Sequence, residues 1–214
     1  MPFILPSSIG SVQIRLLAHG DEKNLVQLAN SLSADTRELF APYKWGADAQ
    51  IQDFKDAILS SEAGKDLSYL LFTPSGTPIG HMALWSVTQP HFLDGKNIKI
   101  PTLGICIAND FQRKGLGRIG VNFLQKQARE IGVNAIELTF APRNYRAERL
   151  YQSQGFEDIG MLRIPLGVNP AAQNVDLKSV KVWRDERHFA YIIDHNNATA
   201  IKSYLKNKQT KKVQ

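Results

Sequence analysis

The chain has 214 residues, with 43% apolar and 21% charged side chains, which is enough for one sizeable globular domain with a hydrophobic core. A net charge of +6, from 26 basic and 20 acidic residues, suits an anionic cofactor, a nucleic acid or an acidic substrate equally well. No apolar run approaches the roughly 20 residues of a membrane span, the first residues lack the features of a secretory signal, and Cys106, the single cysteine, excludes an intramolecular disulfide. We therefore expect a cytoplasmic protein that makes no membrane contact.

The first half of the chain is predicted to form a strand, two helices and a β-hairpin. In chain order, these are a strand at Val12–Leu16, a helix after the N-cap residue Asp21, a helix at Ala49–Ser60, and strands at Leu67–Thr73 and Ile79–Val87. The turn residues Pro74–Pro78 join the two hairpin strands. The polar stretch Gln89–Lys99 contains Pro90 and Gly95 and is predicted to be a loop.

The second half alternates strands and helices. The expected elements are a strand at Leu103–Ala108, a helix at Leu116–Ile131, a strand at Asn134–Phe140, a helix at Ala147–Gln154, strands at Phe156–Ile164 and His188–Asp194, and a helix at Ala198–Lys206. Pro165–Ser179 has no periodicity and is expected to be an excursion. The order predicts a single α/β layered domain with one mixed sheet, its core at about residues 12–206 and a basic, flexible tail at residues 207–214.

The most informative segment runs from Ile105 to Gly117 and reads as a strand, a turn and the start of a helix. A helix start offers unpaired backbone N–H groups and the positive end of the macrodipole, and the glycines let this backbone approach a bulky anion. Arg113, Lys114 and Arg118 add positive charge. The segment therefore predicts a diphosphate site, although two glycines alone also suit a plain strand-to-helix turn. The spacing fits neither a nucleoside-triphosphate P-loop nor a dinucleotide fingerprint.

Two motifs, in this order, resemble those of the GNAT superfamily of N-acetyltransferases. Gln112, Gly115 and Gly117 match the cofactor loop of that family, Gln/Arg-x-x-Gly-x-Gly/Ala. The second motif, Asn-x-x-Ala-x-x-Leu-Tyr-x-x-x-Gly-Phe, is matched at all its fixed positions by Asn144, Ala147, Leu150, Tyr151, Gly155 and Phe156. The resemblance covers about Leu103 to Phe156 and implies a mixed, mostly antiparallel central sheet with helices on both faces.

The resemblance also implies an activity, in which a primary amine attacks the thioester of acetyl-coenzyme A directly in a ternary complex. The backbone of Ile105, Cys106 and Ile107 would bind the pantetheine arm, and an N–H group near Ile107 would face the thioester oxygen. The pyrophosphate would lie after Gln112, on the amides of Arg113, Lys114, Gly115, Leu116, Gly117 and Arg118. Asn144 would hydrogen-bond the cofactor arm, and Tyr151 would protonate the departing thiolate. No metal is expected.

The sequence leaves the general base and the acceptor pocket open. Thr102 and Thr139 occupy places where family members often carry a glutamate, and Glu137 is predicted to lie one pleat too far along its strand. A buried histidine is the favoured interpretation of His81, while His91 and Asp94 are weaker candidates. The aromatic stretch Phe40–Trp45 and Trp85 are candidates for the acceptor pocket, with ordinary packing favoured. Cys106 is expected to be a buried structural thiol.

Two other classes of function also fit parts of the sequence. A non-catalytic, CoA-binding or regulatory module with the same fold is the main alternative, favoured slightly by the two threonines and disfavoured by Tyr151 and Asn144. The calculated pI of 9.4 would suit a nucleic-acid-binding protein, but the basic residues form no stripe interleaved with aromatic residues, so no nucleic-acid partner is expected. The acceptor is expected to be a small-molecule or peptide amine, and its identity is left open. Whether the protein forms a homodimer is also left open.

Overall fold

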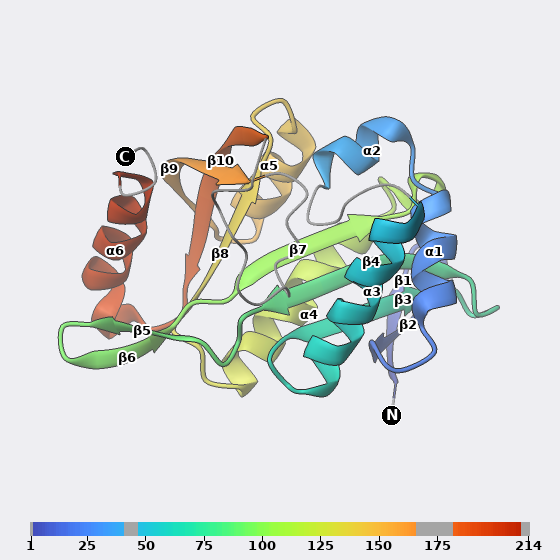
Figure 1. The fold of residues 1–214 in the computed structure, drawn as a ribbon, viewed down its shortest axis with the longest axis horizontal. Coiled ribbons are helices and arrows are strands. Elements are labelled where there is room, and N and C mark those ends of the chain that lie inside the picture. The colour runs from blue at the N-terminus through green and yellow to red at the C-terminus, as the bar shows by residue number, and fades with distance from the viewer. Residues whose placement is uncertain (1, 41–46, 166–181, 211–214) are drawn as a thin grey trace.

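Eight strands form one sheet in the order β1-β2-β3-β4-β7-β8-β10-β9 in the computed structural model, which describes residues 2–40, 47–165 and 182–210 (Figure 1). These strands are β1 (Phe3–Ser7), β2 (Gly10–Leu16), β3 (Leu67–Phe72), β4 (Pro78–Trp85), β7 (Thr102–Ile107), β8 (Ala135–Phe140), β9 (Glu157–Pro165) and β10 (Trp183–Ile192). Neighbouring strands pair antiparallel, except that β7 and β8 are parallel. The predicted mixed, mostly antiparallel sheet is thus confirmed.

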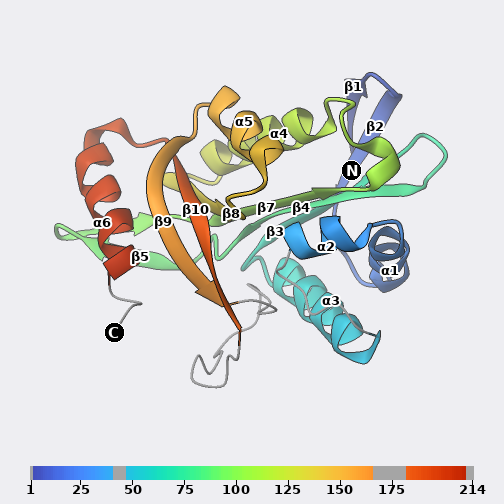
Figure 2. The same ribbon diagram turned by 90° about the horizontal axis from the view of Figure 1, so that it is seen from above.

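Helices cover both faces of this sheet, as expected. Figure 2 shows α4 (Leu116–Glu130) and α5 (Tyr145–Ser153) on one face and α1 (Glu22–Asn30), α2 (Ala34–Leu39) and α3 (Ala47–Glu62) on the other. The last helix, α6 (Ala198–Thr210), packs against β9 at the end of the sheet. Because side chains alternate along a strand, each strand contributes to both layers of the core.

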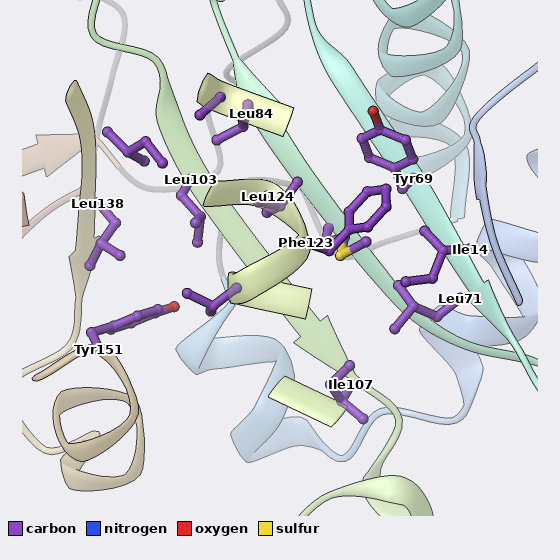
Figure 3. Packing of buried hydrophobic residues seen from close by; sticks show 14 of the residues in the cluster. Ile14, Tyr69, Leu71, Leu84, Leu103, Ile107, Phe123, Leu124, Leu138 and Tyr151 are labelled. Carbon is purple, nitrogen blue, oxygen red and sulfur yellow. The ribbon is translucent and has the colours of Figure 1, made fainter. Parts of the chain in front are cut away.

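The larger part of the core lies between the sheet and α4 with α5. Phe123 and Leu124 of α4 pack there against Tyr69, Leu84 and Leu103 of the sheet (Figure 3). On the opposite face, Cys106 of β7 packs with Leu25 and Leu28 of α1 and with Phe54 of α3. Within the described ranges, no helix is both long enough and apolar enough to cross a membrane.

Several local predictions were wrong or incomplete. Gln89–Lys99 was predicted to be a loop, but it contains the hairpin strands β5 (Pro90–Leu93) and β6 (Lys96–Lys99). The turn between them is Asp94-Gly95, with φ of 46° and 78°, a residue pair that favours tight hairpins. The strand β1 and the short helix α2 were not predicted as separate elements.

The C-terminal helix also extends further than expected. It continues to Thr210, so the first residues assigned to a flexible tail are helical, and only residues 211–214 of that tail lie outside the described ranges. The excursion predicted for Pro165–Ser179 lies outside the described residues after Pro165, the last residue of β9.

The parallel pair β7 and β8 opens the middle of the sheet. The only register that joins them is Thr102 opposite Glu137, while β7 pairs with β4 over its whole length and β8 pairs with β10. Beyond Thr102 the two strands therefore diverge, and the polar edge of β7 on that side is not used by β8.

Candidate active site

A cavity of about 530 Å³ occupies the gap between β7 and β8. At one end it is lined by Gly117 of α4 and by Asn144, Leu150 and Tyr151 around α5. At the other end, it is lined by residues from the α2 side of the sheet and from the C-terminal elements: Phe40, Trp85, Thr102, Glu137, Thr139, Arg184, Glu186 and Lys208. We call these the cofactor end and the acceptor end.

The edge of β7 between these two ends carries backbone polar groups directed into the gap. The N–H group of Ala108 donates to the carbonyl of Ile79 on the β4 side, with a donor–acceptor distance of 2.9 Å. Because backbone groups of successive strand residues point to opposite sides, those of Ile107 and Ile105 face the gap. Gln112 Nε2 donates to the Ile107 carbonyl at 3.0 Å. An extended ligand could thus pair with β7 as an additional strand would.

The loop after β7 curls its backbone amides around the start of α4. Gly115 is the N-cap residue of α4 with φ of 77°, and Arg113 has φ of 62°, so two residues of this short loop are left-handed. Such a loop at a helix start forms a concave set of N–H groups suited to an anion. The β1–β2 turn supports it, because Ser8 Oγ donates to the Lys114 carbonyl at 2.8 Å.

Not all residues predicted for cofactor binding line the cavity. Those that do are Ile105, Cys106, Ile107, Gln112, Gly117, Asn144 and the predicted acid Tyr151. Arg113, Lys114, Gly115 and Arg118 are exposed around the loop and the first turn of α4, beside the cavity rather than in its wall. Leu116 is 1% exposed and packs in the core, so that only its backbone could contact a ligand.

The short helix α2 is hydrogen-bonded to the same loop. Its N-cap residue, Ser33, accepts through Oγ from Asn109 Nδ2 at 3.1 Å, and the Ser33 N–H donates to Asn109 Oδ1 at 2.9 Å. Gln112 Nε2 also lies 3.5 Å from Thr36 Oγ1. The family-motif residue Gln112 thereby joins three parts of the site: the end of β7, the phosphate-type loop and α2.

Tyr151 lies in the wall of the cavity and is 7% exposed. Its ring packs beside Phe140 and Phe156, and Figure 3 shows it reaching from α5 toward β7. Burial, reinforced by the negative charge of Glu186, raises the pKa of the Tyr151 hydroxyl above its ordinary value. Tyr151 therefore stays protonated at neutral pH, in the form that can donate a proton.

Asn144 has a local structural role that leaves one group available. It is the N-cap residue of α5, where its Oδ1 accepts from the Ala147 N–H at 3.2 Å. The side chain also lines the cavity, and its Nδ2 group remains a donor. Capping and contact with a ligand are compatible.

Two buried carboxylates line the acceptor end, and the first of them, Glu186, was not identified from the sequence. Glu186 of β10 is 3% exposed and is held by Arg184, whose Nε donates at 2.8 Å and whose Nη2 forms the ion pair. Arg184 in turn donates through Nη1 to the Glu38 carbonyl at 2.9 Å. Glu186 belongs to no local sequence motif. Its only signal is weak: it is a charged residue on a strand, paired with the apolar Leu162 of β9.

The second carboxylate, Glu137, was expected to be too far along β8, yet it lines the cavity. Lys208 Nζ lies 2.6 Å from its Oε1, and His188 Nε2 lies 3.0 Å from its Oε2. Burial would raise the pKa of Glu137, but Lys208 and His188 outweigh it and lower the pKa to about 2. So weak a base does not accept a proton readily from an amine at neutral pH.

The other candidates take the following places. Thr102 and Thr139 both line the acceptor end. His81 is 1% exposed, and burial lowers its pKa to about 4, which agrees with a core histidine. His91 contacts Tyr204 of α6 through Nδ1 at 2.8 Å, away from the cavity, and Asp94 lies in the β5–β6 turn.

Cys106 and the aromatic residues complete the site. Burial raises the pKa of Cys106 to about 12, which fits the predicted structural thiol. Phe40 and Trp85 line the cavity, and Trp85 also covers Gly104. Residues 41–46, with the rest of the aromatic stretch, lie outside the described residues. In the described ranges, no group of three His, Cys, Asp or Glu residues is placed to hold a metal ion.

Comparison with known proteins assigns the chain to one family. The model of the acetyltransferase (GNAT) family matches residues 27–156. The chain therefore belongs to the GNAT family of acetyltransferases, a family that uses acetyl-CoA. No curated protein sequence matches this chain.

Solved structures share its fold at low sequence identity. An alanine acetyltransferase of a ribosomal protein from Vibrio fischeri has a TM-score of 0.65 and 16% identity, covering 91% of this chain and 98% of that one. Mycobacterium smegmatis RimJ in complex with CoA-disulfide has a TM-score of 0.64 and 16% identity, covering 94% of both chains. The microcin self-immunity acetyltransferase MccE, in complex with acetyl-CoA and AMP, has a TM-score of 0.63 and 15% identity, covering 85% of this chain and 92% of that one.

Proposed function

We propose that this protein transfers the acetyl group of acetyl-CoA to a primary amine by direct attack in a ternary complex. The observation that carries the proposal is the continuity of one cavity, from the glycine loop of α4 past Tyr151 to two buried carboxylates. The pyrophosphate would lie on the amides of Arg113–Arg118, and the pantetheine arm along Ile105–Ile107. The thioester oxygen would then face an N–H group of β7, which stabilises its developing negative charge.

The chemistry requires one bond to form and one to break. The amine nitrogen attacks the carbonyl carbon, the C–N bond forms, the C–S bond breaks, and the coenzyme leaves as a thiolate. Tyr151 is the proposed proton donor to that thiolate, because it is protonated at neutral pH and lies in the cavity wall. Asn144 Nδ2 would hydrogen-bond the cofactor arm.

At the acceptor end, we propose that the reacting amine binds beside Glu186. This buried carboxylate lies close enough to Tyr151 to influence its pKa, and an incoming ammonium needs an anion there. Glu186 would orient the amine and accept its proton, directly or through a water molecule held by Thr139. The names of similar structures span ribosomal-protein and microcin-resistance acetyltransferases, so the proposal extends only to primary amines.

The experiment is a thiol-release assay with acetyl-CoA and a panel of amines that includes peptides with a free N-terminus. Steady turnover with any amine supports catalysis; binding of CoA without turnover for all amines favours the non-catalytic module. Tyr151→Phe should lower kcat roughly 10²- to 10⁴-fold with CoA affinity little changed. Tyr145→Phe is the matched control, because Tyr145 is on the same helix but 66% exposed and outside the cavity lining. Undiminished turnover of Tyr151→Phe would refute the assigned role.

A further inference from the structure

The acceptor end of the cavity contains a cation that comes from the protein itself. Lys208 lies in the last turn of α6 and lines the cavity, and its Nζ is 2.6 Å from Glu137 Oε1. It is a primary amine placed in a chamber that, under the proposed function, receives primary amines. The two halves of this ion pair differ in how firmly the fold holds them.

The anionic half is fixed by the sheet. Glu137 is on β8, and its partner His188 is on the adjacent β10 with its side chain fully buried. His188 Nε2 is 3.0 Å from Glu137 Oε2, and Thr102 Oγ1 donates to Oε1 at 3.4 Å. Both carboxylate oxygens are thus held by side chains of the two strands that flank β8, Thr102 of β7 and His188 of β10, independently of Lys208.

The cationic half is attached far more loosely. The apolar anchors of α6 are Ile201 and Leu205, both 0% exposed, and Lys208 is almost one turn beyond them. Its side chain is 26% exposed, whereas that of Glu137 is 7% exposed. The last turn of a helix lacks part of its backbone hydrogen bonding, so it opens at low cost. Lys208 can therefore leave Glu137 without disrupting the core.

We propose that Glu137, Thr102 and His188 form a cation-binding subsite, which Lys208 fills in the free enzyme and a second cationic group of the acceptor takes over. The proposal rests on the proposed acetyl transfer and narrows its substrate class. Thr102 is three residues from Ile105 and five from Ile107 along β7, a span of roughly 10 to 17 Å at about 3.3 Å per residue. The preferred acceptor is thus an elongated amine with a second positive charge at about that distance.

The subsite can be tested by binding alone, without acetyl transfer. Calorimetry compares diaminooctane with octylamine, which has the same length but one charge. The wild-type protein should bind the diamine roughly ten- to a hundredfold more tightly, the equivalent of one charge-assisted hydrogen bond. Glu137→Gln should bind both amines equally. Equal binding of the two amines by the wild-type protein would overturn the proposal, whether or not the protein turns over acetyl-CoA.

A second measurement tests whether Lys208 is the resident occupant. Lys208→Ala should bind butylammonium, and its melting temperature should rise with butylammonium but not with butanol. Lys208→Arg keeps the charge and should show no such response. If Lys208→Ala fails to fold, the wild-type and Glu137→Gln titrations still decide whether the cation subsite exists. A folded Lys208→Ala that is indifferent to butylammonium contradicts the assignment of Lys208 as occupant.

Discussion

The buried carboxylate of Glu137 allows a quantitative prediction about stability. Its pKa in the folded protein is lowered from the ordinary 4.5 to about 2, and each pKa unit corresponds to ~1.4 kcal/mol. The folded state is therefore stabilised by about 3 kcal/mol at neutral pH through this group. Because the folded pKa is the lower one, this contribution is fully present above pH 4.5 and is lost as the pH falls toward 2.

The perturbation is Glu137→Gln, and the assay is urea unfolding at a series of pH values between 7 and 2.5. The wild-type free energy of unfolding should fall by about 3 kcal/mol more than that of the variant across this range. Glu157→Gln is the matched control, since Glu157 forms an ion pair with Lys202 of α6 but its side chain is 57% exposed. Surface pairs contribute about 0 to 1 kcal/mol, so this control should follow the wild-type protein closely. Parallel curves for wild type and Glu137→Gln would refute the reasoning.

Three further predictions concern the glycines and the cysteine. Gly117→Glu should abolish CoA binding in calorimetry with the far-UV CD spectrum preserved, because Gly117 lines the cofactor end of the cavity. Gly104→Ala should destabilise the protein by about 1 to 3 kcal/mol in urea unfolding, since an added Cβ would lie 2.1 Å from Trp85 Cη2; an unchanged midpoint contradicts this. Cys106, with its pKa near 12, should resist iodoacetamide at pH 8 until the protein is unfolded, and fast labelling of the native protein would show that the thiol is accessible.

The cofactor end could be predicted because its signals are local in sequence. Gly115 has a left-handed backbone at the start of α4, and Asn144 caps α5. Both roles depend only on neighbouring residues in the chain, so a short sequence motif is enough to indicate them. The Asp94-Gly95 turn was an equally local signal of a hairpin. The residues on both sides of it are mostly polar, so the segment was predicted to be a loop instead of the strands β5 and β6.

The acceptor end could not be predicted in the same way. Glu186 and Lys208 reach the cavity because β10 inserts between β8 and β9 and α6 packs beyond them. The strand pairings of β10 join residues 18 to 57 positions apart, and Lys208 lies 71 positions from Glu137, so no spacing within one segment encodes these contacts. Glu137 was visible in the sequence, but the divergence of β7 from β8, which exposes it to the cavity, depends on the sheet order.

Under the proposed function, the backbone amides at the start of α4 hold the pyrophosphate of coenzyme A. The most direct measurement of this contact is a calorimetric titration of the purified protein with coenzyme A, repeated with Gly117→Glu. The wild-type protein should bind coenzyme A saturably well below millimolar concentration, and Gly117→Glu should not bind it. The absence of any binding heat from the wild-type protein at millimolar coenzyme A would contradict the proposed function.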